Sequence, residues 1–251
     1  MKVTEAGMGK RYGYRARIGF IAPGSTIETI PVEFYQMVPE GVVIVFVCIG
    51  IKRLTKEDIG NALKEIENAA AELARTKADV IILGGSPPII FGGFGFDQKI
   101  IERIKTVTDI PGTTSQTLAV NALRALKVKK LVVASPFEEN QNSLLKKFLE
   151  DSGFLVHNIK GLNKDRIEYG MLPRDESYHL AIEACKGVED FDGVYLPCAQ
   201  MPTITIIDRL EKELGKPVVT SVQAMIWGAL GITGVNDQIS GYGRLFTVAA
   251  G

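Results

Sequence analysis

Hydrophobic residues along this chain fall into short continuous runs that alternate with longer amphipathic stretches. The run 42–51 is almost entirely apolar and β-branched, which is typical of a strand covered on both faces. The stretch from Thr55 to Arg75 instead repeats apolar residues at helical spacing, and Thr55 with Asp58 resembles a capping box at its start. Alternation of such strands and helices predicts an α/β fold with parallel sheets and right-handed crossovers.

The same two patterns predict the remaining elements. Strands are expected from Arg17 into the 23–25 loop and at 79–83, 110–115, 129–135, 155–159, 193–196 and 216–221. Helices are expected at 97–107, 116–126, 138–152 and 176–185, and after 221 as far as 230.

This order of elements occurs twice. The strand and proline-containing loop at 129–137 repeat those at 17–25, 192–198 repeats 79–85, and 216–221 with its helix repeats 110–115 with its helix, at a spacing of roughly 106 to 113 residues. Pieces repeated in the same order indicate duplication rather than chance likeness of βα units. We therefore expect two pseudo-symmetric Rossmann-like domains with parallel sheets and an active site in the cleft between them. The first would comprise 17–112 with the C-terminal 220–251 and the second 113–219, with 1–16 as an N-terminal arm.

Composition and charge exclude several classes of function. With 46% hydrophobic and 23% charged residues the chain has the composition of an ordinary globular protein. The 29 basic and 29 acidic residues balance, so nothing favours nucleic acid or an anionic membrane as a partner. The longest apolar run is about half of a membrane span, and the basic N-terminus lacks the apolar segment of a secretory signal. A cytoplasmic location is expected, and the sequence leaves monomer and homo-oligomer open.

The residues available for cofactor chemistry are few. Three cysteines form no CxxC pair, and His157 and His179 are the two histidines, so a zinc site and a Ser-His pair both lack components. The glycine-rich segment 91–96 has neither of the common phosphate-binding spacings. We expect no metal and no other cofactor.

Cys198 stands out by its place in the pattern. It follows the predicted strand 193–196, and the carboxyl ends of strands in open parallel sheets are where ligands bind. A loop that opens the next helix would also place the thiol near the positive end of a helix dipole, which eases ionisation. The alternative is a small buried core residue, which is how we interpret Cys48 inside a strand and Cys185 inside a helix.

Small hydroxyl side chains lie at or just after the carboxyl ends of several of the predicted strands. They are Ser25, Thr26, Ser86, Thr113, Thr114, Ser115, Thr220 and Ser221. Taken singly, each is as well explained by helix N-capping. Gathered around a cleft with a thiol and backbone N–H groups, they favour binding of a small anionic carbon acid without a metal.

Motifs over nearly the whole chain resemble those of the Asp/Glu racemase superfamily, in the branch that holds arylmalonate decarboxylase and maleate cis-trans isomerase. The matching segments are 21–28 (Ile-Ala-Pro-Gly-Ser-Thr-Ile-Glu), 83–86 (Leu-Gly-Gly-Ser), 111–115 (Pro-Gly-Thr-Thr-Ser), 122–126 (Ala-Leu-Arg-Ala-Leu), 196–198 (Leu-Pro-Cys) and 241–246 (Gly-Tyr-Gly-Arg-Leu-Phe). The resemblance implies two pseudo-symmetric α/β domains, no cofactor, and a cleft between the domains that holds a small carboxylic acid.

The resemblance also assigns roles. Racemases and the isomerase of this superfamily use one cysteine from each half; here Cys198 matches the second-half position and Gly85 the first-half position. Without a second thiol the two-base route is lost, whereas one thiol suffices to protonate a carbanion after carbon dioxide leaves. Gly24 stands where the isomerase carries an asparagine. The resemblance therefore favours decarboxylation over isomerisation.

The chain departs from the decarboxylase pattern within the expected site. Ser86, Pro87 and Phe137 stand where that enzyme has a Thr-Ser pair and a tyrosine, so Pro87 and Phe137 lack the corresponding donors. Loss of one oxyanion donor costs roughly 10²- to 10³-fold in rate, so other groups must replace it or the substrate differs. Candidate replacements are Thr113, Thr114 and Ser25. An apolar lining is expected from Ile89, Ile90, Phe91, Phe94, Met201 and Phe137, which could equally be core.

The leading hypothesis is a cofactor-independent decarboxylase of a substituted malonate-like acid. Cys198 would donate the proton, and the substrate would be held by Gly85, Ser86, Ala199, Thr113, Thr114, Ser115, Ser25 and Phe137. One alternative is a maleate isomerase-like or amino-acid racemase-like enzyme in which Cys198 attacks a double bond or acts as sole base. The other is a non-catalytic binding protein for small organic acids.

Overall fold

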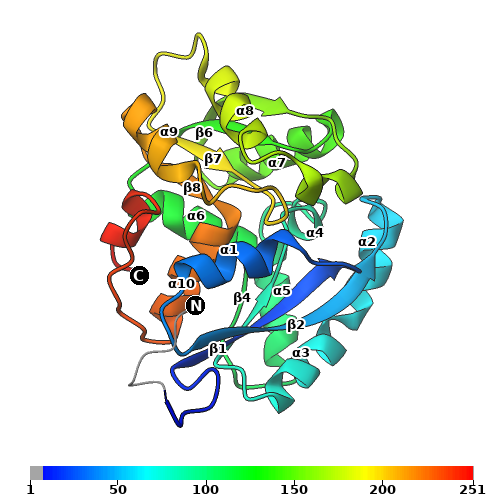
Figure 1. The fold of residues 1–251 in the computed structure, drawn as a ribbon. Coiled ribbons are helices and arrows are strands. Elements are labelled where there is room, and N and C mark those ends of the chain that lie inside the picture. Colours follow the sequence, from blue (N-terminus) through cyan, green and yellow to red (C-terminus); the bar gives the residue numbers. More distant parts are fainter. Residues whose placement is uncertain (1–7, 251) are drawn as a thin grey trace.

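The computed structural model describes residues 8–250, which form two four-stranded parallel sheets (Figure 1). The first sheet has the order β2-β1-β3-β4 and the second the order β6-β5-β7-β8, so each half places its strands in the same order. The strands are β1 (Ala16–Gly24), β2 (Val42–Ile51), β3 (Val80–Leu83), β4 (Gly112–Thr114), β5 (Lys130–Ser135), β6 (Leu155–Gly161), β7 (Gly193–Leu196) and β8 (Val218–Thr220). The predicted α/β fold with two pseudo-symmetric parallel sheets is confirmed.

Helices connect the strands, and some of them lie between the two sheets. They are α1 (Thr29–Met37), α2 (Lys56–Ala62), α3 (Ile66–Arg75), α4 (Pro87–Ile90), α5 (Phe96–Lys105), α6 (Ser115–Ala125), α7 (Glu139–Asp151), α8 (Glu176–Cys185), α9 (Ile207–Leu214) and α10 (Ser221–Ile232), with the 3₁₀ turns η2 (Leu63–Glu65), η3 (Arg166–Met171) and η4 (Arg244–Thr247). None of the helices within 8–250 combines the length and the apolar character that crossing a membrane requires.

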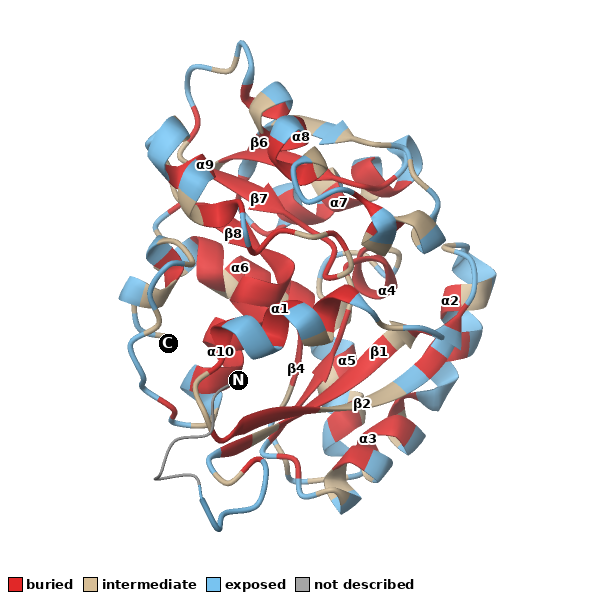
Figure 2. Ribbon diagram, in the orientation of Figure 1, coloured by how far each residue is buried: buried red, intermediate tan, exposed pale blue. Residues whose placement is uncertain are grey.

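Figure 1 shows α1, α4, α6 and α10 lying between the two sheets. Every residue of α10 from Ser221 to Leu230 is buried, and in Figure 2 this helix and α6 form the buried centre of the molecule. A helix that is apolar all round is buried on all sides. Both helices start in the same way, because Thr114 and Thr220 are N-caps whose side chains accept the N–H of the residue three positions on. The two halves therefore meet through equivalent helices.

Several boundaries differ from the predicted ones. The single helix expected over 55–75 is divided by η2 into α2 and α3. α1 and η3 were not predicted, because α1 follows a Pro-Gly-Ser loop without a side-chain cap and η3 lies in a long connection. The predicted domain boundaries, at 112/113 and 219/220, fall inside β4 and β8.

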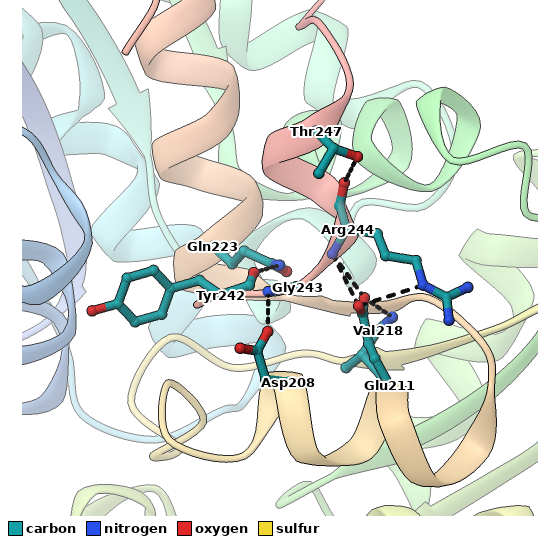
Figure 3. Close-up of polar contacts among 8 residues, drawn as sticks. All are labelled: Asp208, Glu211, Val218, Gln223, Tyr242, Gly243, Arg244 and Thr247. Carbon is teal, nitrogen blue, oxygen red and sulfur yellow. Dashed lines mark hydrogen bonds and ion pairs between the residues drawn. The ribbon is translucent and has the colours of Figure 1, made fainter. Parts of the chain in front are cut away.

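The C-terminal segment after α10 contacts both halves. Asp237 pairs with Arg15 ahead of β1, and the Tyr242 hydroxyl donates to the Gln36 carbonyl at 2.8 Å. Figure 3 shows the other side of this segment, where the Gly243 and Arg244 amides donate to carboxylates of α9. The Gly-Tyr-Gly-Arg segment thus joins the first-half helix α1 to the second-half helix α9. Of the predicted N-terminal arm, residues 1–7 lie outside the described residues, and 8–15 are turns that lead into β1.

Candidate active site

A cavity of about 70 Å³ lies where the carboxyl ends of strands from both sheets meet. It is lined by residues that follow β1, β3, β5 and β7, together with parts of α1, β2 and η3, so it belongs to both halves. The lining residues are Phe20, Ala22, Pro23, Gly24, Thr26, Ile27, Ile30, Ile51, Leu54, Gly85, Ser86, Pro87, Pro88, Phe137, Arg166, Tyr169, Cys198, Ala199 and Gln200. The walls are therefore mainly apolar, with a few polar groups.

Two positions in this cavity are structural equivalents. Gly85 comes two residues after the end of β3, and Cys198 two residues after the end of β7. Both have a φ angle of 81°, in the left-handed region. A side chain with a Cβ adopts this region at a cost of roughly 1–2 kcal/mol, and such strain is concentrated at functional sites. The backbone that presents the thiol in one half is thus repeated in the other half with a glycine.

Burial controls the charge of the Cys198 thiol. Its side chain is 8% exposed, and loss of hydration raises its pKa to about 12. The backbone N–H groups of Gln200 and Met201 and the Arg166 guanidinium act in the opposite direction without overcoming burial. Cys198 is therefore a neutral thiol at neutral pH. The helix expected to start beside Cys198, α9, starts only at Ile207. The prediction that the dipole of this helix eases ionisation of the thiol is therefore wrong.

The loop that carries Cys198 is held by α1 of the other half. The buried Glu33 carboxylate accepts the backbone N–H groups of Thr203 and Ile204, and the Thr203 hydroxyl donates to it at 3.1 Å. The Thr29 hydroxyl donates to the Gln200 carbonyl at 2.7 Å. Burial raises the pKa of Glu33, while these hydrogen bonds lower it. The position of the thiol thus depends on contacts between the halves.

The structure brings five of the predicted site residues together in the cavity. These are Gly85, Ser86, Phe137, Cys198 and Ala199. Thr26 and Pro87 also line it.

The other predicted site residues lie outside the lining. Ser25 is exposed beyond Gly24, and Thr113 and Ser115 are buried next to Thr114. Thr114 is engaged as the N-cap of α6, since its hydroxyl oxygen accepts the Thr117 N–H at 3.0 Å. This hydroxyl is therefore a helix N-cap, the alternative that the sequence left open.

The apolar lining is built from other residues than those expected. Ile89, Ile90 and Met201 are buried core residues outside the cavity, Phe91 packs against the core, and Phe94 is 63% exposed. In their place Ile30, Ile51 and Leu54 reach the cavity from the first half.

Sequence reasoning missed two polar groups on η3. Arg166 and Tyr169 both line the cavity, and the Tyr169 ring lies against Phe137 with ring centroids 5.9 Å apart. Burial and the nearby Cys198 raise the pKa of Tyr169, which keeps its phenol protonated. The chain therefore has a phenol beside the position where Phe137 lacks one. The signal that could have located η3 is the Asp165-to-Glu168 capping box at its start.

A second layer of polar groups lies behind Ser86. The Tyr195 hydroxyl and the Gln116 side-chain amide are fully buried and find no hydrogen-bond partner of normal geometry in the described part of the chain, and Ser86 and Ser221 lie beside Tyr195. Burial raises the pKa of Tyr195 to about 12, so this hydroxyl also keeps its proton. Ser86 thus connects the cavity to buried donors.

Comparison with known proteins gives a consistent set of similarities. A family model described as arylmalonate decarboxylase matches residues 18–246. Arylmalonate decarboxylase of Bordetella bronchiseptica is 27% identical over 234 residues, covering 91% of this chain and 95% of that protein. A maleate isomerase of Pseudomonas putida is 27% identical over 246 residues, covering 93% and 98%.

Solved structures are similar over the same range. A double variant of arylmalonate decarboxylase in its liganded form has a TM-score of 0.86 at 25% identity, covering 92% of this chain and 98% of that one. A variant of the maleate isomerase of Pseudomonas putida S16 with maleate has a TM-score of 0.85 at 23% identity, covering 92% and 97%, which supports the shared fold.

Proposed function

This chain belongs to the arylmalonate decarboxylase family, and on that premise we propose that it is a cofactor-independent decarboxylase of a substituted malonate-like acid. The observation that carries the proposal is the pair of equivalent positions in the cavity, of which Cys198 bears a thiol and Gly85 bears no side chain. One proton donor serves a reaction in which carbon dioxide leaves and a proton takes its place.

In the proposed reaction the bond between the α-carbon and one carboxylate breaks, and its electron pair moves into the retained carboxylate to give an enediolate. The Cys198 thiol then transfers its proton to the α-carbon, the enediolate returns to a carboxylate, and water reprotonates the thiolate. A donor with a pKa of about 12 holds its proton at neutral pH until a strongly basic carbon appears. The raised pKa of Cys198 therefore supports a role as acid.

Donors for the enediolate oxygens are available around the thiol. The Ser86 hydroxyl, the Ala199 amide and the Tyr169 phenol belong to residues that line the cavity. Donors aimed at developing negative charge account for a large part of catalysis in such reactions. The apolar walls contributed by Ile51 and Leu54 favour loss of the leaving carboxylate by removing its hydration.

The isomerase alternative is supported by the similarity to maleate isomerases. In that route Cys198 adds to a double bond as a thiolate, allows rotation about the resulting single bond, and leaves again. The raised pKa of Cys198 and the absence of a side chain at Gly85 both count against it. In the binding-protein alternative Cys198 has no chemical role.

Proton NMR in D₂O with aryl- and alkylmalonates, maleate and chiral amino acids tests the proposal. We expect loss of a carboxyl with one deuterium gained at the same carbon, and no such product with Cys198→Ala. Cys185→Ala is the matched control, because Cys185 is also a buried thiol with a raised pKa but lies outside the cavity lining. Cis–trans change without carbon loss would establish the isomerase instead, and full turnover by Cys198→Ala would exclude the proposed mechanism.

A further inference from the structure

Arg166 is the charged side chain among the cavity-lining residues in the described part of the chain. It is the first residue of η3, which belongs to the second half of the molecule. Among residues 8–250 no carboxylate lines the same cavity, so none of these residues gives the guanidinium a counter-charge there. A small apolar cavity with one cation is electrostatically suited to an anion.

The acidic residues next to Arg166 in the sequence form hydrogen bonds with other groups. Asp165 and Glu168 form the capping box of η3, and Glu168 also accepts from Lys164. Within residues 8–250, the hydrogen bond of Arg166 runs from Nε to the Lys52 carbonyl at 3.4 Å, and no carboxylate forms an ion pair with it. The terminal nitrogen atoms are therefore available for a carboxylate, which a guanidinium binds by paired hydrogen bonds.

Gly24 provides the room for this guanidinium. A Cβ atom added at Gly24 would lie 2.6 Å from the Nη1 atom of Arg166, closer than two such atoms approach. Any larger residue at this position must displace the guanidinium. The last residue of β1 and the turn η3, one from each half, thus jointly place the cation against the cavity.

The reaction itself leaves no use for a guanidinium on the leaving carboxylate. That group loses its charge as carbon dioxide departs, so a cation bound to it stabilises the ground state and slows the step. In the proposed function the retained carboxylate is bound by the hydrogen-bond donors around Cys198. A cation elsewhere in the cavity therefore fits a third group on the substrate.

We infer that Arg166 is a specificity-determining residue that selects substrates with a further anionic group, such as a carboxylate, on the substituent of the reacting carbon. This inference deepens the proposed function and rests on it for the identity of the reacting carbon. The presence of an anion-selecting cation beside Cys198 can be tested without any turnover.

The first test compares alkylation of Cys198 by iodoacetate, an anion, and by neutral iodoacetamide at pH 9. The Cys198 peptide is quantified by mass spectrometry, so that reaction at Cys48 does not enter. A change in thiol pKa affects both reagents equally, and their rate ratio therefore reports attraction of the carboxylate. We expect Arg166→Gln to lower the iodoacetate-to-iodoacetamide ratio by roughly tenfold or more, as for loss of a hydrogen bond to a charged group.

Three variants serve as controls for the alkylation ratio. Arg166→Lys should keep most of the ratio, and Gly24→Ala should give an intermediate value because it displaces the guanidinium without removing it. Lys52→Gln removes a neighbouring exposed cation outside the cavity lining and should change the ratio less than twofold. An unchanged ratio in Arg166→Gln, an equal loss in Lys52→Gln, or a Cys198 that neither reagent modifies would each overturn the inference.

The second test uses turnover of phenylmalonate and of 3-carboxyphenylmalonate. We expect the wild-type chain to prefer the carboxylated compound in kcat/KM, and Arg166→Gln to reduce this preference roughly 10- to 100-fold. If neither compound reacts but the alkylation ratio behaves as expected, the proposed decarboxylation fails and the anion selectivity of Arg166 stands. If both react equally in both proteins and the ratio is unchanged, the decarboxylation stands and the role of Arg166 fails.

Discussion

The ends of β3 and β7 hold the same backbone conformation with different chemistry. Gly85 and Cys198 share a φ of 81°, and both line one cavity. At Gly85 the left-handed conformation has no steric cost, because glycine has no Cβ atom. At Cys198 the same conformation is sterically unfavourable, because cysteine has one. Since glycine makes the same turn at Gly85 without this steric cost, the turn alone does not require a residue with a Cβ atom at position 198.

The two strand ends are also supported differently. After β3 the chain enters α4 directly at Pro87, so the conformation at Gly85 is fixed by a local element. After β7 the chain runs as a loop over 197–206 before α9, and Glu33 and Thr29 of α1 hold that loop. The backbone conformation at Gly85 is therefore determined by its own chain neighbours, whereas the position of Cys198 depends on contacts with the other half of the molecule.

Replacing the Cys198 thiol tests its proposed role as proton donor directly. Cys198→Ser should lower turnover by roughly 10²- to 10⁴-fold, the range for loss of a general acid, because a serine hydroxyl is a far weaker acid than a thiol. Steady-state kinetics on the substrate found by NMR measures this. The thermal midpoint should stay nearly unchanged, since the hydroxyl replaces an atom in a partly polar cavity. An equal loss of turnover in Cys185→Ser would show that buried thiols act through the fold and not through chemistry.

Removing the Glu33 carboxylate tests whether the loop that carries Cys198 depends on α1. Glu33→Ala leaves the Thr203 and Ile204 amides without their acceptor in a buried place, and we expect a loss of roughly 3 kcal/mol in the free energy of unfolding. Urea denaturation measures the loss. Glu33→Gln retains one acceptor oxygen and should lose less. Alkylation of Cys198 should also become faster in Glu33→Ala because the loop is released; an unchanged rate would mean that the loop is held by other contacts.

Adding a side chain at Gly85 measures what the left-handed conformation after β3 costs a residue with a Cβ atom. Gly85→Ala would carry a Cβ at a φ of 81° and 2.9 Å from the Cγ atom of Pro23. We expect a loss of roughly 1–2 kcal/mol in unfolding free energy from the left-handed conformation alone. Gly187→Ala, which also has a positive φ but nothing within 4 Å, separates the backbone penalty from the contact with Pro23. Equal losses in the two variants would assign the whole effect to the backbone.

The raised pKa of Cys198 makes stability fall at high pH. Below the ordinary thiol pKa of about 8.5 both folded and unfolded states are protonated, and Cys198 contributes no pH dependence. Above it the unfolded state releases the proton while the folded state keeps it up to about pH 12, so unfolding becomes easier by roughly 1.4 kcal/mol per pH unit. Urea midpoints between pH 8.5 and 10 should fall more steeply for the wild-type chain than for Cys198→Ser. Parallel curves would mean that the folded thiol ionises in this range.

The sequence predicted the elements whose pattern is local and missed those set by long-range contacts. The strand β7 and helix α8 match their predicted ranges, because a buried run and an amphipathic stretch with clear ends determine them. Cys198, Gly85 and Ser86 could be placed in the cavity from their positions after strands. Arg166, Tyr169 and Glu33 could not, since they act through tertiary contacts of segments that show no strong periodicity. Ser25 and Ser115 also follow strands, and Thr113 lies within β4, so a position at a strand end alone does not tell which of several loops face the cavity.

Two replacements of the Cys198 thiol should differ slightly in stability. Cys198→Ala and Cys198→Gly both remove the sulfur, but only the glycine relieves the left-handed conformation that the structure shows at this position. Glycine also loses more conformational entropy on folding, which offsets part of the gain. We therefore expect Cys198→Gly to be more stable than Cys198→Ala by about 1 kcal/mol, the reverse of the usual order at a residue with negative φ. Urea denaturation of the two proteins at pH 7 measures the difference. An alanine variant as stable as the glycine variant would mean that the 197–206 loop relaxes once the sulfur is gone. In that case contacts with α1 would determine the backbone conformation at position 198.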